Sequence, residues 1–141
     1  MEEREVDFTE LIGEHMLSGV EFGTAPKGEY DDSDPNTVDF IMDGETYSAI
    51  EDPSDGYRSS MRSLRQNRAG VEIKNRFAPV KVIGSMRPDD DYEKNNVLDF
   101  VDATNGKIVL SIGTADIDDY YPGFVGDWTP ENLSINEGAK S

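Results

Sequence analysis

The sequence predicts an α+β fold, mainly an antiparallel sheet built from hairpins, with one central helix and a short N-terminal helix. Three observations predict this class: two pairs of alternating segments are joined by tight-turn residues, one segment between them has helical spacing, and no repeat of fixed period is evident. At 141 residues the chain fits one domain, residues 1–141, with ends at 1–6 and 132–141 that we expect to fray.

The short N-terminal helix is predicted to begin after Asp7. Glu10 follows three residues later, as in a capping box, and Gly13 would end the helix. The apolar side would consist of Phe8, Leu11 and Ile12. The residues 15–22 that follow are expected to extend as a first strand.

Two hairpins are the clearest local signals. Segments 37–42 and 45–51 flank Asp43-Gly44, a dipeptide typical of a type I′ turn, and segments 97–102 and 107–114 flank Thr104-Asn105-Gly106. Strand character is also predicted at 71–73 and 79–86. Alternation suggests the inward side chains, namely Val38, Phe40, Met42, Leu98, Phe100, Ile108, Leu110 and Ile112.

The central helix is predicted over residues 57–67, because Tyr57, Met61 and Leu64 recur at helical spacing. The opposite side of this helix would align guanidinium groups that, with nearby Arg76, form a candidate anion-binding site. Planar guanidinium groups suit carboxylates and phosphates. Internal pairing with the many carboxylates of the same domain is the alternative. The candidate anion-binding residues are Arg58, Arg62, Arg65 and Arg76.

The charge is strongly divided along the chain. The net charge is −17, yet seven of the thirteen cationic side chains lie between Arg58 and Lys81. A negative field repels polyphosphates and attracts basic proteins, so we expect a protein partner with a basic surface and no direct binding of nucleic acid. With no cysteine and no long apolar run, the sequence predicts a cytoplasmic protein without a membrane role, a cofactor or a metal.

A second candidate site lies near the C-terminus, where carboxylates alternate with large aromatic side chains. Aromatic residues are enriched at binding hot spots, and neighbouring carboxylates would steer a basic partner. Closure of one end of the sheet by the aromatic rings is the alternative interpretation. The candidate protein-binding residues are Asp116, Asp118, Asp119, Tyr120, Tyr121 and Trp128.

Enzymatic signatures are weak in this chain. His15 is the single histidine, and neither a nucleophile elbow nor a phosphate-binding loop occurs. Asp55 with Glu72-Ile73-Lys74 resembles the arrangement of magnesium-dependent nucleases, but such spacing is easily met among thirty acids. The acidic runs at 31–34 and 89–93 lack the pattern of a calcium loop and are expected to be solvated turns.

Several short segments resemble small uncharacterised proteins of bacteriophage genomes. These segments are Leu11-Ile12-Gly13, Leu17-Ser18-Gly19-Val20, Phe40-Ile41-Met42-Asp43-Gly44, Glu51-Asp52-Pro53-Ser54-Asp55-Gly56-Tyr57-Arg58-Ser59, Thr104-Asn105-Gly106-Lys107 and Asp118-Asp119-Tyr120-Tyr121-Pro122. The resemblance carries no assigned activity. It implies a context in which small acidic proteins bind and block a host protein, in some cases by imitating the charge of nucleic acid.

The leading hypothesis from the sequence is therefore a non-enzymatic, phage-encoded inhibitor that binds a host protein in the host cytoplasm through its acidic surface. The alternative is a protein that sequesters an anionic small molecule or nucleotide signal on the arginine residues. A magnesium-dependent, nuclease-like enzyme is the third hypothesis.

Overall fold

The computed structural model describes residues 2–29, 31, 33–53, 60–87, 96–116 and 122–134. They form one nine-stranded antiparallel sheet in the order β1-β5-β4-β3-β2-β6-β7-β8-β9. The strands are β1 (Arg4–Glu5), β2 (Gly13–Thr24), β3 (Asn36–Met42), β4 (Glu45–Glu51), β5 (Met61–Gln66), β6 (Arg76–Met86), β7 (Asn96–Asp102), β8 (Ile108–Asp116) and β9 (Pro122–Trp128). No helix of seven or more residues occurs among the described residues, so the predicted α+β class is wrong.

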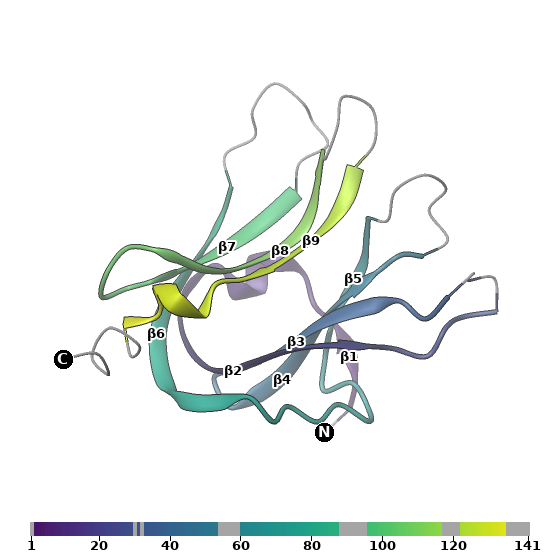
Figure 1. Cartoon of the computed structure of the whole chain (residues 1–141), viewed down its shortest axis with the longest axis horizontal. Coiled ribbons are helices and arrows are strands. Elements are labelled where there is room, and N and C mark those ends of the chain that lie inside the picture. Colours follow the sequence, from purple (N-terminus) through teal and green to yellow (C-terminus); the bar gives the residue numbers. More distant parts are fainter. Residues whose placement is uncertain are drawn as a thin grey trace.

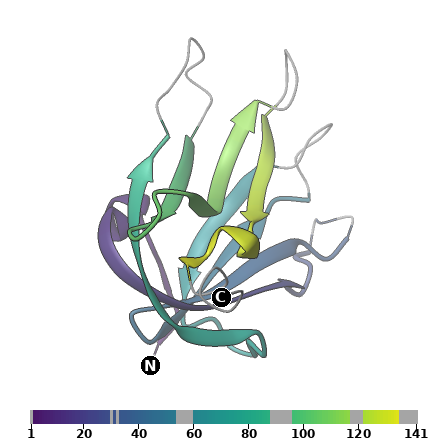
Figure 2. The same cartoon turned by 60° about the vertical axis from the view of Figure 1, so that its left-hand side comes forward.

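The sheet folds over on itself to make two facing layers. Strands β7, β8 and β9 lie over β3, β4 and β5, while β2 and β6 bend between the layers (Figures 1 and 2). The layers meet at Phe40 and Phe100, whose ring centroids are 6.0 Å apart. The core between the layers includes Leu17, Val20, Val38, Phe40, Met42, Leu98, Phe100, Val109, Leu110 and Ile112.

The predicted central helix is replaced by strand β5. Strand β4 pairs Ile50 with Ser63 but Glu51 with Met61, so a bulge leaves Arg62 between the two pairs. The extra residue brings Met61 and Leu64, three positions apart, to the same core. A bulged strand thus reproduces the three-residue spacing that the sequence suggests for a helix. Tyr57, the first residue of that pattern, lies outside the described residues.

Both predicted hairpins are confirmed. Asp43 (φ 53°) and Gly44 (φ 81°) have the two positive φ angles that a type I′ turn requires between β3 and β4. Strands β7 and β8 form the second hairpin. The prediction that Ile108 points inward is wrong, because the register shifts between Phe100 and Val101; Ile108 is 42% exposed and Val109 is buried instead.

The predicted strand at 71–73 is also wrong. Residues 67–75 form a crossover that runs across the outer face of β4, β3 and β2 before β6 begins. Arg68 contacts Asp39 of β3 and Ser48 of β4, and the Asn75 amide donates to the carbonyl of Val20 on β2. Ile73 is buried at 4% exposure, so its apolar character marks one anchor of the crossover.

The two chain ends are partly fixed in the described region. The predicted capping box is present, with the Asp7 carboxylate accepting from the Thr9 N–H and Glu10 accepting from the Asp7 N–H, but the helix that it caps is one 3-10 turn, η1 (Phe8–Leu11). β1 pairs with β5. At the other end a second 3-10 turn, η2 (Pro130–Asn132), precedes Leu133, which is 2% exposed.

The sheet consists of two halves with the same topology. The first half (β2–β5) and the second half (β6–β9) are four-stranded meanders that join where β2 pairs antiparallel with β6. The sequence Asn-x-x-Asp-Phe begins β3 at Asn36 and β7 at Asn96. In each half the aspartate of this motif faces a serine of the next strand, as Asp39 with Ser48 and Asp99 with Ser111. The two halves thus repeat the same strand topology around the same short motif.

Candidate functional site

The predicted arginine set does not form a free anion pocket among the described residues. Arg62 donates from both terminal nitrogens to Asp31, at 3.0 and 2.6 Å, and from Nη2 to Asp52 at 3.0 Å. These hydrogen bonds raise the pKa of Arg62 and lower that of Asp31. Arg65 donates to Glu3, and Arg76 donates to the carbonyl of Ile73. Arg58 lies outside the described residues.

The other described arginine residues are paired as well. Arg4 contacts Glu10 at 2.8 Å, Arg68 contacts the buried Asp39 and Arg87 contacts the buried Asp99. Internal ion pairs thus engage Arg4, Arg62, Arg65, Arg68 and Arg87, while the acids outnumber all cationic side chains by 30 to 13. Exposed carboxylates in the described region include Glu2, Glu5, Glu14, Glu29, Glu72, Asp127 and Glu131. The negative charge is therefore carried mainly on the surface.

The predicted C-terminal site falls partly on β9. Trp128 ends this strand, and its ring stacks on Phe77 of β6 at a centroid separation of 5.8 Å. Asp116 is the last residue of β8, and its side chain is not described. Asp118, Asp119, Tyr120 and Tyr121 lie outside the described residues.

The residues considered for metal or acid-base chemistry are dispersed in the described region. Glu72 and Lys74 are exposed on the crossover, on either side of buried Ile73, and Asp55 is outside the described residues. Within the described part of the chain, no three histidine, aspartate or glutamate side chains converge as a metal site. His15 Nδ1 lies 2.7 Å from Oδ2 of Asp43, in the β3–β4 turn.

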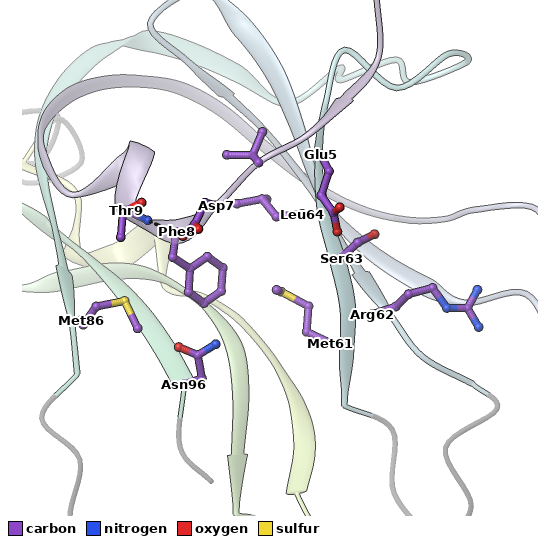
Figure 3. Close-up of a pocket in the computed structure, with 11 residues that line it drawn as sticks. Glu5, Asp7, Phe8, Thr9, Met61, Arg62, Ser63, Leu64, Met86 and Asn96 are labelled. Carbon is purple, nitrogen blue, oxygen red and sulfur yellow. Dashed lines mark hydrogen bonds between the residues drawn. The ribbon is translucent and has the colours of Figure 1, made fainter. Parts of the chain in front are cut away.

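A first cleft, of about 410 Å³, lies between the N-terminal segment and β5 (Figure 3). The ring of Phe8 points into the space between Met61 of β5 and Met86 at the end of β6, and Asn96 of β7 lies beside them (Figure 3). Phe8 is buried at 8% exposure. The chain's own N-terminal segment therefore forms one wall of this cleft and contributes the ring of Phe8 to its apolar lining.

A second cleft, of about 360 Å³, lies between β9 and the adjoining ends of β2 and β3. Its apolar lining includes Phe22, which at 57% exposure is the most exposed large hydrophobic side chain among the described residues, and Phe124. Its other lining residues are Gly23, Asn36, Thr37, Val38, Gly126 and Asp127. An apolar and acidic surface is thus accessible beside β9.

The two clefts occupy equivalent places in the two halves. Met86 pairs with Leu98 in the second half as Phe22 pairs with Val38 in the first, so Met86 and Phe22 correspond. The same registers relate Gln66, Arg65 and Leu64 of β5 to Trp128, Asp127 and Gly126 of β9, because their partners on β4 and β8 correspond. The N-terminal segment forms one wall of the first cleft and narrows it, and the second has no such segment in the described region.

Among the described residues, the outer edge of β9 is unpaired at the same place. Thr129 N–H donates to the carbonyl of Val109, which fixes the phase of the antiparallel ladder. Alternate residues then direct their backbone groups away from β8, and these include Phe124, Gly126 and Trp128. On β5 the equivalent edge binds β1, with the Val6 N–H donating to the Leu64 carbonyl at 2.8 Å. No described strand pairs with the edge of β9.

Comparison with known proteins finds no matching family model, no matching curated protein and no matching solved structure. Across the described residues, no helix has both the length and the apolar character needed to cross a bilayer.

The candidate sites proposed from the sequence include none of the residues that line the second cleft, among them Phe22, Asn36 and Gly126. The signal that points to them is the repeated Asn-x-x-Asp-Phe motif at residues 36–40 and 96–100. The motif aligns the two halves. The alignment then shows that β5 has a further strand, β1, on its outer edge, whereas no described strand pairs with the outer edge of β9. The spacing between corresponding residues is not constant, because the turn at 103–107 is longer than Asp43-Gly44. A search for a fixed period therefore does not detect the repeat.

Proposed function

We propose that this chain is a non-enzymatic binding protein, encoded by a phage, that inhibits a host protein by covering a basic surface of that protein with its own acidic surface. It would act in the host cytoplasm on a protein that normally binds nucleic acid. The acidic chain would compete with the nucleic acid and would not bind it. The charge inventory carries the proposal: five of the described arginine residues pair with carboxylates of the fold, and many of the carboxylates in excess are exposed.

The physical basis is long-range steering followed by short-range contact. A surface with excess negative charge accelerates encounter with a basic protein and repels competing acidic surfaces. Interactions between exposed charges are screened by salt, over a length of about 8 Å at physiological ionic strength. The association should therefore weaken as the salt concentration rises.

Affinity capture tests the proposal. The immobilised chain is incubated with bacterial host lysate at low salt, and bound proteins are released by a salt step. We expect a basic protein that binds DNA or RNA, and we expect the free chain to displace the nucleic acid from it. A triple variant E5Q, E14Q, E29Q should bind this protein more weakly and with a smaller salt dependence, because these carboxylates make no ion pair among the described residues. Recovery of no basic protein would contradict the proposal.

The anion-binding alternative has no such support in the described region. A small anion at Arg62 would have to displace the carboxylates of Asp31 and Asp52, which already satisfy the guanidinium group. The geometry therefore favours protein binding over capture of a nucleotide.

A further inference from the structure

We infer that the open edge of β9 accepts an added antiparallel strand from the partner, an extended segment that carries a basic residue followed by apolar residues. This inference rests on the proposed function and specifies where and how the partner binds. The added strand would pair with Gly126 and Trp128 and place apolar side chains in the second cleft.

The first half of the molecule supplies the template for this strand. There Arg4 of β1 pairs with Gln66 and Glu5 pairs with Arg65. One residue further along, the Val6 N–H donates a hydrogen bond to the Leu64 carbonyl. The positions on β9 that correspond to Gln66, Arg65 and Leu64 are Trp128, Asp127 and Gly126. A strand added to β9 in the same register would extend the sheet as β1 does on β5. Any extended segment can make the main-chain hydrogen bonds of such an edge, so its side chains decide which segment binds.

The side chains of β9 define the chemistry of the added strand. In the first half, the basic Arg65 of β5 faces the acidic Glu5 of β1. The residue of β9 that corresponds to Arg65 is the exposed, acidic Asp127. Opposite charges that face each other across strands are favourable and like charges are unfavourable. The residue that faces Asp127 should therefore be Lys or Arg.

The apolar residues of the added strand follow from the same correspondence. Phe8 lies three residues after Glu5, and its ring lies between Met61 and Met86 (Figure 3). In the second cleft the corresponding side chains are Phe124 and Phe22, and Phe22 is left 57% exposed. An aromatic or aliphatic side chain three residues after the basic residue would cover Phe22. The pattern of the bound segment is thus basic, apolar, any residue, apolar.

The N-terminal segment of a second copy is a poorer occupant of this edge. It would place Glu5 opposite Asp127, and each copy carries a net charge of −17. The electrostatic argument therefore favours a basic segment of another protein over a homodimer.

A peptide titration tests the inference with the full chain. The probes are a synthetic peptide that copies residues 2–11 with the substitution E5K and the same peptide with the native Glu5. Trp128 is the single tryptophan of the chain, so its fluorescence reports binding at β9, and amide shifts of Gly126 and Trp128 locate it. We expect the E5K peptide to bind about fivefold more tightly than the native peptide. The variant D127K should reverse this preference.

Two matched surface variants separate the cleft from general hydrophobicity. Phe22→Ser should abolish peptide binding, whereas Ile108→Ser, which alters another exposed apolar side chain, should leave it unchanged. Equal affinity of both peptides for both proteins, or binding that leaves Gly126 and Trp128 unperturbed, would overturn the inference. So would a concentration-dependent dimer that protects the β9 edge. If the captured host protein still binds D127K and Phe22→Ser normally, the strand-addition inference fails while the proposed function stands.

Discussion

Asp39 and Asp99 hold the same place in the two halves of the sheet. Each is 7% exposed, and each accepts a hydrogen bond at 2.6 Å from the serine across its hairpin, Ser48 or Ser111. Each also binds an arginine, but the arginine comes from a different place in the sequence: Arg68 belongs to the crossover and Arg87 follows β6. The buried carboxylate and its serine partner therefore occupy equivalent positions in the two halves, whereas the arginine residues that bind the carboxylates do not.

We expect Asp39→Ala and Asp99→Ala each to lower the free energy of unfolding by about 2 kcal/mol, because each leaves a serine hydroxyl and a guanidinium group without their acceptor. Ser48→Ala and Ser111→Ala should cost about 1 kcal/mol each. Urea denaturation of the four variants measures these differences. Aspartate variants as stable as the native chain would show that the carboxylates do not hold the hairpins together.

We expect Gly126→Ala to lower the free energy of unfolding by about 1–3 kcal/mol through overpacking. A Cβ atom at this position would lie 2.5 Å from Cγ2 of Val38, too close without movement of one layer. Val38→Ala removes the obstructing methyl groups, so the double variant should cost less than the sum of the two single variants. Strict additivity in a double-mutant cycle would contradict the contact between β9 and β3.

We expect the free energy of unfolding to depend on pH through Asp102, which binds the backbone of Ser134 near the C-terminal end of the described chain. Burial by itself would raise the pKa of this carboxyl, but hydrogen bonds from the backbone N–H groups of Ser134 and Thr104 outweigh burial and lower the pKa below 3.8. A group whose pKa is lower in the folded state stabilises the fold at pH values above its unfolded pKa. That stabilisation is lost as the pH falls through the folded pKa.

The comparison of the native chain with Asp102→Asn measures this effect. Near neutral pH the variant should be less stable by about 1–3 kcal/mol. The difference should begin to shrink as the pH falls below 3.8, where the carboxyl of the unfolded chain takes up a proton, and should be smallest below the lower pKa of the folded state. A stability difference that is the same near neutral pH and in acid would show that the charge of Asp102 contributes nothing to the free energy of unfolding.

Arg62→Met should raise the pKa of Asp31 toward its ordinary value of 3.8, because the hydrogen bonds from Arg62 are the main cause of its lowered pKa. A carboxyl-detected NMR titration measures this pKa directly. Arg65→Met is the matched control, since Arg65 binds Glu3 and should leave Asp31 unchanged. An Asp31 pKa that does not move in Arg62→Met would mean that Arg62 is free in solution and would reopen the anion-binding alternative.

Much of the sheet could be predicted from sequence because its signals are local. Asp43-Gly44 requires only its own two backbone conformations to specify a hairpin, and the capping box at Asp7 needs only Glu10. Strand β5 could not be recognised in this way. Its bulge at Arg62 depends on the pairing with β4, and the resulting spacing of Met61 and Leu64 is also the spacing of a helix.

The candidate site was harder to predict for a different reason. The acidic and aromatic residues near Trp128 suggest a binding surface, but the open edge is a relation between β9 and the strands that do not cover it. Phe22 is about one hundred residues away in sequence, and no counterpart of Phe8 lies beside it in the described second half. Only the duplicated topology places these features together.

Amide hydrogen exchange of β9 tests the central claim, that a basic strand of the partner adds to this edge. We expect the amides of Gly126 and Trp128, which face away from β8, to exchange at least about tenfold more slowly when the E5K peptide or the captured host protein is bound. The amides of Val125 and Asp127 face β8 and should be protected in both states. Unchanged exchange at Gly126 and Trp128 in a saturated complex would contradict the claim.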